Sequence, residues 1–285
     1  VQYYPSDIES YIELFSGAMW CFFNMNLNKF PYLKTVVYND FNSLNANLFR
    51  CAKDHDNFYD ELLKYPCQQY GVKDTPTEYK SMFEQFQKEV FDPKLILGDE
   101  PNFEIGAKYA YVLGQTFSGM KPATSSYIDL KGKYRSKFLS FVNKFKDQKY
   151  IDHLDKITFI ENNDFEDVIK KYDSFNSFFY LDPPYKEREN QYSNHNFDNH
   201  SHIRLKHILK NIKGKWCLSY YDFPELSEWY PRSIYQWEKK DYKKASGASI
   251  GKKQSTGTEL LIMNYNPTIY INNTDNDDEN TENIA

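Results

Sequence analysis

An apolar run that ends in two prolines constrains the fold of this chain more than any other segment. Residues 178–185 read Phe-Phe-Tyr-Leu-Asp-Pro-Pro-Tyr, and the first four are apolar and prone to β structure, which predicts a buried strand. Pro183 and Pro184 cannot continue a strand, because each proline fixes φ and removes an N–H donor. The strand should therefore stop at Asp182 and present its carboxylate at the carboxyl edge of the sheet, where open α/β sheets bind ligands.

The residues at this edge are suited to bind a planar amine. The Asp182 carboxylate and the Pro183 carbonyl offer two acceptors side by side, and Tyr185 adds an aromatic face. An exocyclic amine on a nucleobase has two N–H donors and a π face, so it complements this set. Asp-Pro-Pro alone favours a plain surface turn after an edge strand. The apolar strand before it and the tyrosine after it favour a ligand-binding site.

Short apolar runs recur along the chain and alternate with segments of helical period. The expected strands cover 11–15, 34–38, 157–160, 178–181 and 215–220, with a closing pair near 232–238 and 258–265. The expected helices cover the segment from the first strand to about Asn28, Asn42 to Lys53, 165–172 and 199–212. This alternation predicts an α/β fold with a doubly wound, mostly parallel, Rossmann-like sheet. The closing pair should be antiparallel and joined by the loop 241–257.

A block of longer helical patterns interrupts this alternation between residues 55 and 150. Its amphipathic segments, such as Tyr79–Val90, are broken at Pro93, Pro101 and Pro122. We therefore expect an inserted, mainly helical domain over 55–150, within an α/β domain that covers 1–54 and 151–270. Residues 271–285 are rich in Asn, Asp and Glu and are expected to form a disordered acidic tail.

The net charge of −5 is unevenly distributed. Residues 275–285 carry five acids and no base, so the rest of the chain is neutral overall, and its basic residues cluster in 121–149, 204–215 and 239–253. Local basic patches, rather than net charge, neutralise phosphates, although each cluster could equally be a solvated helix face or a mobile loop. The expected nucleic-acid-binding residues are Lys121, Lys131, Lys133, Arg135, Tyr192, Lys243 and Lys244.

The cysteines and the hydropathy pattern limit the cellular compartments in which the protein is expected. Cys21, Cys51, Cys67 and Cys217 lack C-x-x-C spacing, which favours reduced thiols in an intracellular protein over disulfides or a metal site. No run of eighteen apolar residues exists, so no membrane span is expected. Val1 is not a methionine and no charged-then-apolar leader follows it, which favours a shortened chain over a processed secreted protein.

The order of motifs resembles that of the DNA adenine methylase family of amino-group DNA methyltransferases. The resemblance covers roughly residues 5 to 266, and Asn163-Asp164-Phe165 stands eighteen residues before Asp182, as the third acidic motif does in that family. The other matching segments are 11–17 (Tyr-Ile-Glu-Leu-Phe-Ser-Gly), 36–42 (Val-Val-Tyr-Asn-Asp-Phe-Asn), 117–119 (Phe-Ser-Gly), 218–222 (Leu-Ser-Tyr-Tyr-Asp) and 259–265 (Glu-Leu-Leu-Ile-Met-Asn-Tyr).

The resemblance implies site-specific methylation of double-stranded DNA at N6 of an adenine, with S-adenosylmethionine as the methyl donor. Such a base must leave the duplex, and Tyr185 would then stack on it while Asp182 and Pro183 accept its amine hydrogens. The helical block 55–150 would choose the target sequence. No covalent nucleophile is needed, which agrees with the lack of a convincing Cys–His or Ser–His arrangement.

Six residues are expected to bind the cofactor. An acid directly after a strand suits ribose hydroxyls, which makes Asp40 the candidate, although Asn39-Asp40 could also form a turn. By resemblance, Asp164 would hold the adenine amine of the cofactor and Phe165 would pack beside that ring. Asp164 could instead only cap the following helix. Also by resemblance, Phe15 and Gly17 would border the cofactor, and Glu13 would lie near the glycine turn.

Two departures from the family leave other activities open. Met19 stands where the family usually has a second glycine, and the opening Trp/Tyr-x-Gly-Gly-Lys segment is absent. A missing N-terminal segment or a partner subunit could complete the cofactor site, or the protein could bind DNA with a degenerate site. Cytosine N4 or an RNA base is the alternative methyl acceptor, and the target sequence and biological role stay open.

Overall fold

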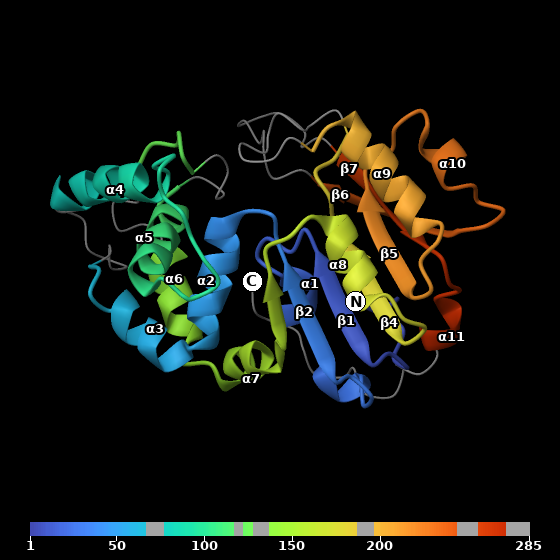
Figure 1. Cartoon of the computed structure of the whole chain (residues 1–285), viewed down its shortest axis with the longest axis horizontal. Helices are drawn as coiled ribbons and strands as arrows, with labels where there is room; N and C mark the ends of the chain where they lie inside the picture. Colours follow the sequence, from blue (N-terminus) through green and yellow to red (C-terminus); the bar gives the residue numbers. More distant parts are fainter. Residues whose placement is uncertain (67–76, 117–121, 128–136, 187–196, 244–255, 272–285) are drawn as a thin grey trace. The chain divides into compact units, whose positions relative to one another are not determined.

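The computed structural model describes residues 1–66, 77–116, 122–127, 137–186, 197–243 and 256–271 (Figure 1). Its strands form one seven-stranded sheet in the order β3-β2-β1-β4-β5-β7-β6. The strands are β1 Ser10–Leu14, β2 Thr35–Asn39, β3 Phe159–Glu161, β4 Ser177–Leu181, β5 Lys215–Tyr220, β6 Gln236–Lys243 and β7 Thr256–Met263. β1, β4 and β5 pair in parallel, whereas β7 is antiparallel to both β5 and β6. The predicted mostly parallel α/β sheet is therefore confirmed.

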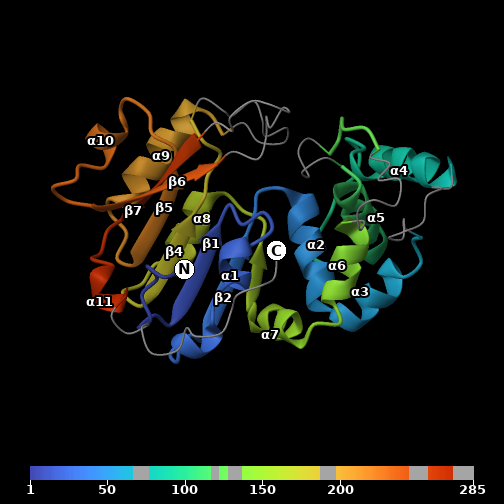
Figure 2. The same ribbon diagram turned by 180° about the vertical axis from the view of Figure 1, so that it is seen from behind.

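The chain divides into two compact units, and the first comprises Val1–Val37, Asp164–Glu189 and Phe197–Ala285. Its helices are α1 Trp20–Phe23, α8 Phe165–Tyr172, α9 Asn199–Leu209, α10 Leu226–Trp229 and α11 Thr268–Ile271. Helices α8 and α9 cover one face of the sheet, and α1 lies on the opposite face (Figures 1 and 2).

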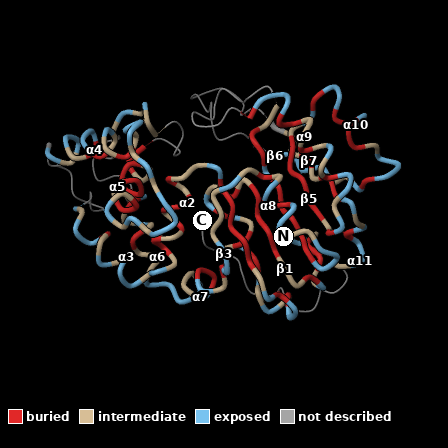
Figure 3. The backbone as a smooth tube through the Cα atoms, viewed as in Figure 1, coloured by how far each residue is buried: buried red, intermediate tan, exposed pale blue. Residues whose placement is uncertain are grey.

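Alternate residues of the central strands face these two layers. Ile12 and Leu14 of β1 and Leu181 of β4 join the buried cluster beneath α8 and α9. Tyr11 and Phe178 point the other way, where Tyr11 stacks on Phe22 of α1 at 5.7 Å between ring centroids. β4 is buried over its whole length, as its unbroken apolar sequence predicts, and Figure 3 shows the same burial along β1 and β5.

The second unit comprises Tyr38–Asn163 and Asn190–Asn196, and its described helices surround α5. Helix α5 is buried on most sides because Gly, Ala and aromatic residues occupy nearly every turn. Gly106 and Gly114 let neighbouring elements approach α5 closely. The helices are α2 Ser43–Lys53, α3 His55–Leu62, α4 Thr77–Val90, α5 Phe103–Gly114, α6 Lys137–Lys144 and α7 Gln148–Lys156.

Several expected elements differ from the structure. The segment expected to be helical as far as Asn28 contains α-helix only over Trp20–Phe23, and this helix starts late because Phe15, Gly17 and Met19 before it hold left-handed backbone. The third strand begins at Phe159 rather than 157, since Ile157 terminates α7. The closing pair is shifted toward its connecting loop, because β6 covers Gln236–Lys243 instead of 232–238 and β7 covers Thr256–Met263 instead of 258–265.

The described part of the chain includes no helix long and apolar enough to cross a membrane. Within the same residues, no group of three or more His, Cys, Asp or Glu side chains could hold a metal ion. Cys21, Cys51 and Cys217 are free thiols, and Cys67 lies outside the described residues.

Candidate active site

The carboxyl ends of β1, β4 and β5 bring together two predicted site residues, Phe15 and Asp182, and a third residue that was not predicted, Ser219. Leu14, Leu181 and Leu218 occupy one row of the sheet. The next residues along the three strands are Phe15, Asp182 and Ser219, so they follow one another along the sheet edge. The strand order reverses between β1 and β4, and such a reversal marks the ligand-binding crevice of a doubly wound sheet.

Asp182 is exposed to solvent although Pro183 and Pro184 beside it are buried. The pKa of Asp182 is raised to about 6, first by loss of hydration among crowded protein atoms and then by the negative charge of Glu259. The Asp182 carboxyl group is therefore an accessible acceptor that is mostly ionised at neutral pH.

The Pro183 carbonyl and Tyr185 complete this turn. None of the described residues donates a hydrogen bond to the Pro183 carbonyl oxygen, which leaves it available to a ligand. The Tyr185 hydroxyl donates to Asp182 Oδ1 at 2.8 Å. The Tyr185 ring packs against Tyr221, with 4.1 Å between ring centroids and a 37° interplanar angle. Tyr185 thus orients the carboxylate in addition to presenting an aromatic ring.

The chain that leaves Tyr185 is anchored by Lys186. Its Nζ lies 4.8 Å from the ring centroids of both Phe223 and Trp229, and 3.1 Å from Glu225 Oε2. Cation–π contacts of this kind stabilise a lysine that is largely shielded from solvent.

The loop after β1 has an unusual backbone. Phe15, Gly17 and Met19 have φ values of 60°, 50° and 54°, a region that residues with side chains rarely adopt. The left-handed turn at Phe15 breaks the alternation of β1 and directs its ring toward Phe165 and Phe197, 5.6 and 5.3 Å away between centroids. Met19 is fully buried in a left-handed conformation that glycine adopts without strain.

Glu13 lies on β1, on the sheet face that also carries Tyr11. The Tyr11 hydroxyl donates to Glu13 Oε2 at 2.5 Å, and only 3% of Glu13 is exposed. Burial raises the pKa of Glu13 to about 8, despite the opposing hydrogen bond from Tyr11. Glu13 is therefore mostly protonated at neutral pH.

Asp164 and Phe165 lie at the start of α8. Asp164 Oδ1 accepts from the Glu166 amide at 2.9 Å and from Arg204 Nη2 at 2.7 Å, so the helix cap considered from the sequence is present. None of the described residues is bonded to the second oxygen of Asp164. The Arg204 guanidinium lies 4.8 Å from the Phe165 ring centroid.

Asp40 belongs to the second unit, directly after β2. Its Oδ1 accepts from the Asn42 amide at 2.8 Å and its Oδ2 from Asn45 Nδ2 at 3.2 Å, which is the turn considered as the alternative. Asn162 Nδ2 donates to the backbone carbonyls of Asp40 and Phe41, at 2.7 and 3.0 Å. The acid is buried and hydrogen bonds fix its loop.

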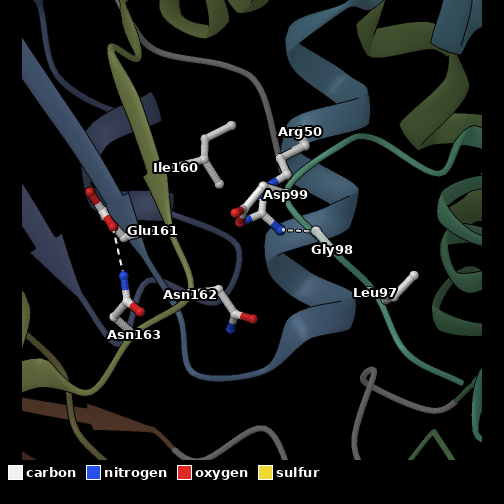
Figure 4. Close-up of a pocket in the computed structure, with 8 residues that line it drawn as sticks. All are labelled: Arg50, Leu97, Gly98, Asp99, Ile160, Glu161, Asn162 and Asn163. Atoms are coloured by element: carbon white, nitrogen blue, oxygen red, sulfur yellow. Dashed lines mark hydrogen bonds and ion pairs between the residues drawn. The ribbon is translucent and has the colours of Figure 1, made fainter. Parts of the chain in front are cut away.

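A polar pocket of about 600 Å³ lies in the second unit (Figure 4). Arg50 donates from Nη1 to the Gly98 carbonyl at 3.1 Å and pairs through Nη2 with Asp99 at 3.0 Å. On the other side, Asn163 Nδ2 donates to Glu161 Oε2 at 2.7 Å. The pocket is lined by Arg50, Leu97, Gly98, Asp99, Ile160, Glu161, Asn162 and Asn163.

Most of the expected DNA-binding residues fall outside the described part of the chain. These are Lys121, Lys131, Lys133, Arg135, Tyr192 and Lys244. Lys243 ends β6, where only its backbone is described. In the basic segment 204–215, Arg204 pairs with Asp164 and Glu166, and Lys215 pairs with Asp7, so part of its positive charge is neutralised within the first unit.

Sequence reasoning missed Ser219, Glu259 and Arg204. Ser219 and Glu259 lie in segments that were interpreted only as strands, although a polar residue on the inner face of an apolar strand was an available signal. Arg204 is 40 positions from Asp164, and no local pattern connects the two.

A doubly wound sheet with an acidic turn after β4 and a tight loop after β1 defines the Rossmann-like methyltransferase class. The model of the D12 class N6 adenine-specific DNA methyltransferases matches residues 1–245, and the chain belongs to this family. The chain is also 24% identical to Type II methyltransferase M.MjaIII of Methanocaldococcus jannaschii, over 91% of this chain and 89% of that protein. Family membership establishes adenine DNA methylation and implies a methyl-donor cofactor.

Proposed function

We propose that Asp182 and the Pro183 carbonyl bind the amine of a flipped-out adenine and that the protein transfers a methyl group from S-adenosylmethionine to its N6. The observation that carries this proposal is an exposed carboxylate beside a carbonyl oxygen to which no described residue donates, at the point where the strand order reverses. Two acceptors fixed by a Pro-Pro turn match the two hydrogens of an amine.

The chemistry follows from where these acceptors point. The N6 lone pair is delocalised into the purine ring, and acceptors on both N–H groups favour a pyramidal, more nucleophilic nitrogen. The lone pair of N6 would form the new N–C bond to the methyl carbon, and the electrons of the broken C–S bond would stay on the sulfur of the donor. The nitrogen then loses one proton, for which the Asp182 carboxylate is the nearest base. Fixed dipoles of this kind stabilise charge that develops only in the transition state.

The first unit contains a suitable setting for the methyl donor, which supplies a methyl group activated by a positively charged sulfur. Phe15 and Phe165 form an aromatic wall, and Gly17 keeps the loop after β1 free of a side chain. The free oxygen of Asp164 would accept the adenine amine of the cofactor. Glu13 and Asp40 remain predicted contacts, with Asp40 assigned to the ribose.

Double-stranded DNA is the proposed partner. An adenine within a duplex cannot reach a sheet edge, so it must be flipped, and Tyr185 offers the stacking ring. We assign sequence choice to the helical block 55–150 and phosphate contacts to the predicted basic residues. The relative M.MjaIII is called a Type II methyltransferase, and a restriction–modification role is proposed on that basis. We also propose an intracellular location, because the substrate is DNA.

Transfer of a labelled methyl group, followed by nucleoside analysis, tests the proposal. The purified protein is incubated with S-adenosylmethionine and unmethylated genomic DNA, and the digested DNA is separated chromatographically. We expect the label in N6-methyldeoxyadenosine. Label in N4-methyldeoxycytidine or only in RNA would replace the proposed acceptor. DNA binding without transfer, and without heat on titration with S-adenosylmethionine, would indicate a degenerate cofactor site.

A further inference from the structure

A second carboxylate lies beside the Asp182 turn within the first unit. Glu259 belongs to β7, and its Oε1 accepts a hydrogen bond from Ser219 Oγ at 2.9 Å. The Tyr185 hydroxyl lies 3.2 Å from Ser219 Oγ and 3.3 Å from Glu259 Oε1, and it donates to Asp182 at 2.8 Å. The neighbouring strands β4, β5 and β7 therefore contribute one continuous hydrogen-bonded network.

This network contains two hydroxyl protons and two carboxylates, which limits how the protons can be shared. Each hydroxyl group donates one hydrogen bond at a time. When Ser219 donates to Glu259, the Tyr185 proton is left for Asp182, which is its nearer carboxylate. Without an acceptor at position 259, the Ser219 proton could turn toward Tyr185 or Asp182 and compete for the oxygen that the substrate needs.

Burial keeps this arrangement in place. Ser219 is fully buried and Glu259 is partly buried, whereas Asp182 is exposed. Burial and the charge of Asp182 raise the pKa of Tyr185, so the phenol keeps its proton at neutral pH. The network therefore extends from the protein interior to the carboxylate that a ligand can reach.

Several titratable groups face Asp182 on this side of the sheet. Glu13 of β1 has a pKa raised to about 8 by burial and adds little negative charge near pH 7. Burial and the charge of Asp182 also raise the pKa of Tyr180 in β4, which stays neutral. Lys240 of β6 stands opposite Glu259 in the strand register. The charge of Glu259 raises the pKa of Asp182, while the hydrogen bond from Tyr185 lowers it.

We propose that Glu259 is a positioning residue for methyl transfer, which acts through Ser219 and Tyr185 to direct the Asp182 carboxylate toward the amine of the base. This inference rests on the proposed contact between Asp182 and adenine. Glu259 itself contacts no substrate in this account. Its second effect is electrostatic, because its negative charge makes Asp182 easier to protonate.

The pH dependence of kcat for Glu259→Gln tests this inference. Transfer needs the ionised form of Asp182, so wild-type kcat should fall as the pH drops through about 6. Removal of the negative charge lets Asp182 stay ionised at lower pH, so the acid limb should move down by roughly half a pH unit or more. The amide oxygen still accepts from Ser219 but forms a weaker hydrogen bond than the carboxylate, so kcat on the plateau should fall while the KM for DNA is unchanged.

Glu238→Gln is the matched control, because Glu238 lies one strand further out on β6 and no described residue bonds to its side chain. Its acid limb and plateau should match those of the wild type. An acid limb of Glu259→Gln that coincides with the wild type, together with an unchanged plateau, would overturn the inference. Methyl transfer by the wild type would still support the proposed function, so failure of the inference about Glu259 can be distinguished from failure of the proposed function.

Ser219→Ala provides a second test if Glu259→Gln does not fold. This variant breaks the link but keeps the Glu259 charge, so kcat should fall without a downward shift of the acid limb. Tyr185→Phe added to Ser219→Ala should cost less than Tyr185→Phe alone, because both residues act on Asp182 through one network. Fully additive losses would contradict the proposed link.

Discussion

The Asp164 carboxylate has room for a structural contact and for the proposed cofactor contact. Its Oδ1 caps α8 and pairs with Arg204, whereas its Oδ2 is not bonded within the described residues. The helix cap and the cofactor contact were alternatives at the level of sequence, but a carboxylate has enough lone pairs for both. Arg204 also packs over Phe165, so it orients the two residues that are assigned to the cofactor adenine.

Asp164→Asn should weaken S-adenosylmethionine binding with little loss of stability. Asparagine caps helices as well as aspartate does, and an ion pair with this exposure contributes about 1 kcal/mol or less. Loss of an acceptor for the adenine amine should raise the Kd about tenfold, as expected for one charge-assisted hydrogen bond. Isothermal titration calorimetry gives the Kd, and thermal unfolding gives the stability.

Glu166→Gln is the control for that variant, because Glu166 pairs with the same Arg204 but has no assigned cofactor contact. Its Kd should stay within twofold of the wild type. Equal weakening in both variants would show that the position of Arg204 matters, rather than a direct contact from Asp164.

Residue-scale features differ in how far the sequence predicts them. The place of Asp182 follows from an apolar strand and two prolines, because proline chemistry is local. The contact of Tyr185 with Glu259 could not be predicted, since it depends on the register of β7. The left-handed backbone at Phe15 has no signal in its own side chain, although the neighbouring glycine suggests a tight loop.

At the scale of elements, helix α5 organises the second unit through its glycines. A Cβ atom added at Gly114 would lie 2.5 Å from the Phe138 backbone nitrogen at the start of α6. Backbone atoms cannot move aside as the end of a flexible side chain can. The close approach of these two helices therefore requires glycine.

Gly114→Ala should lower the free energy of unfolding by about 1–3 kcal/mol, the usual cost of overpacking. This penalty outweighs the modest gain in helix propensity that alanine brings. Differential scanning calorimetry should show a Tm lower by several degrees. In Gly98→Ala a Cβ would meet nothing within 4 Å, and the Tm should stay close to the wild type. The same Tm for both variants would contradict this packing.

Strand positions were easier to predict than helix ends. β5 and α8 match their expected ranges, because a short run of buried, mostly apolar residues and amphipathic spacing are strong local signals. The short α1 was not predictable from pattern alone, since its start depends on three left-handed residues in the preceding loop. The antiparallel closing pair was predicted and is confirmed, although the register across β5 and β7 came only from the structure.

At the scale of the whole molecule, charge is separated along the chain. The acids of 275–285 account for the net charge, whereas the bases gather in a few segments. The predicted recognition block 55–150 and the compact unit Tyr38–Asn163 overlap without sharing boundaries, and the division into catalytic and recognition domains stays a prediction.

Replacement of Lys131, Lys133 and Arg135 by alanine should weaken DNA binding at all sequences. Each lost phosphate contact reduces the slope of log K against log salt by about 0.9, so the slope should fall by up to about 3. S-adenosylmethionine affinity should not change. Fluorescence anisotropy at several salt concentrations measures the slope.

The control removes the same charge from Lys80, Lys88 and Lys94, in and just after α4. An equal loss of DNA affinity in both triple variants would show that overall charge, and not the 131–135 cluster, drives binding.

The most direct test of the central claim compares wild type and Asp182→Ala in methyl transfer to N6 of adenine in unmethylated DNA. We expect N6-methyldeoxyadenosine from the wild type, and at least a hundredfold less from Asp182→Ala with nearly normal DNA binding. Undiminished N6 methylation by Asp182→Ala would contradict the assignment of the strand-end carboxylate as the group that binds the amine.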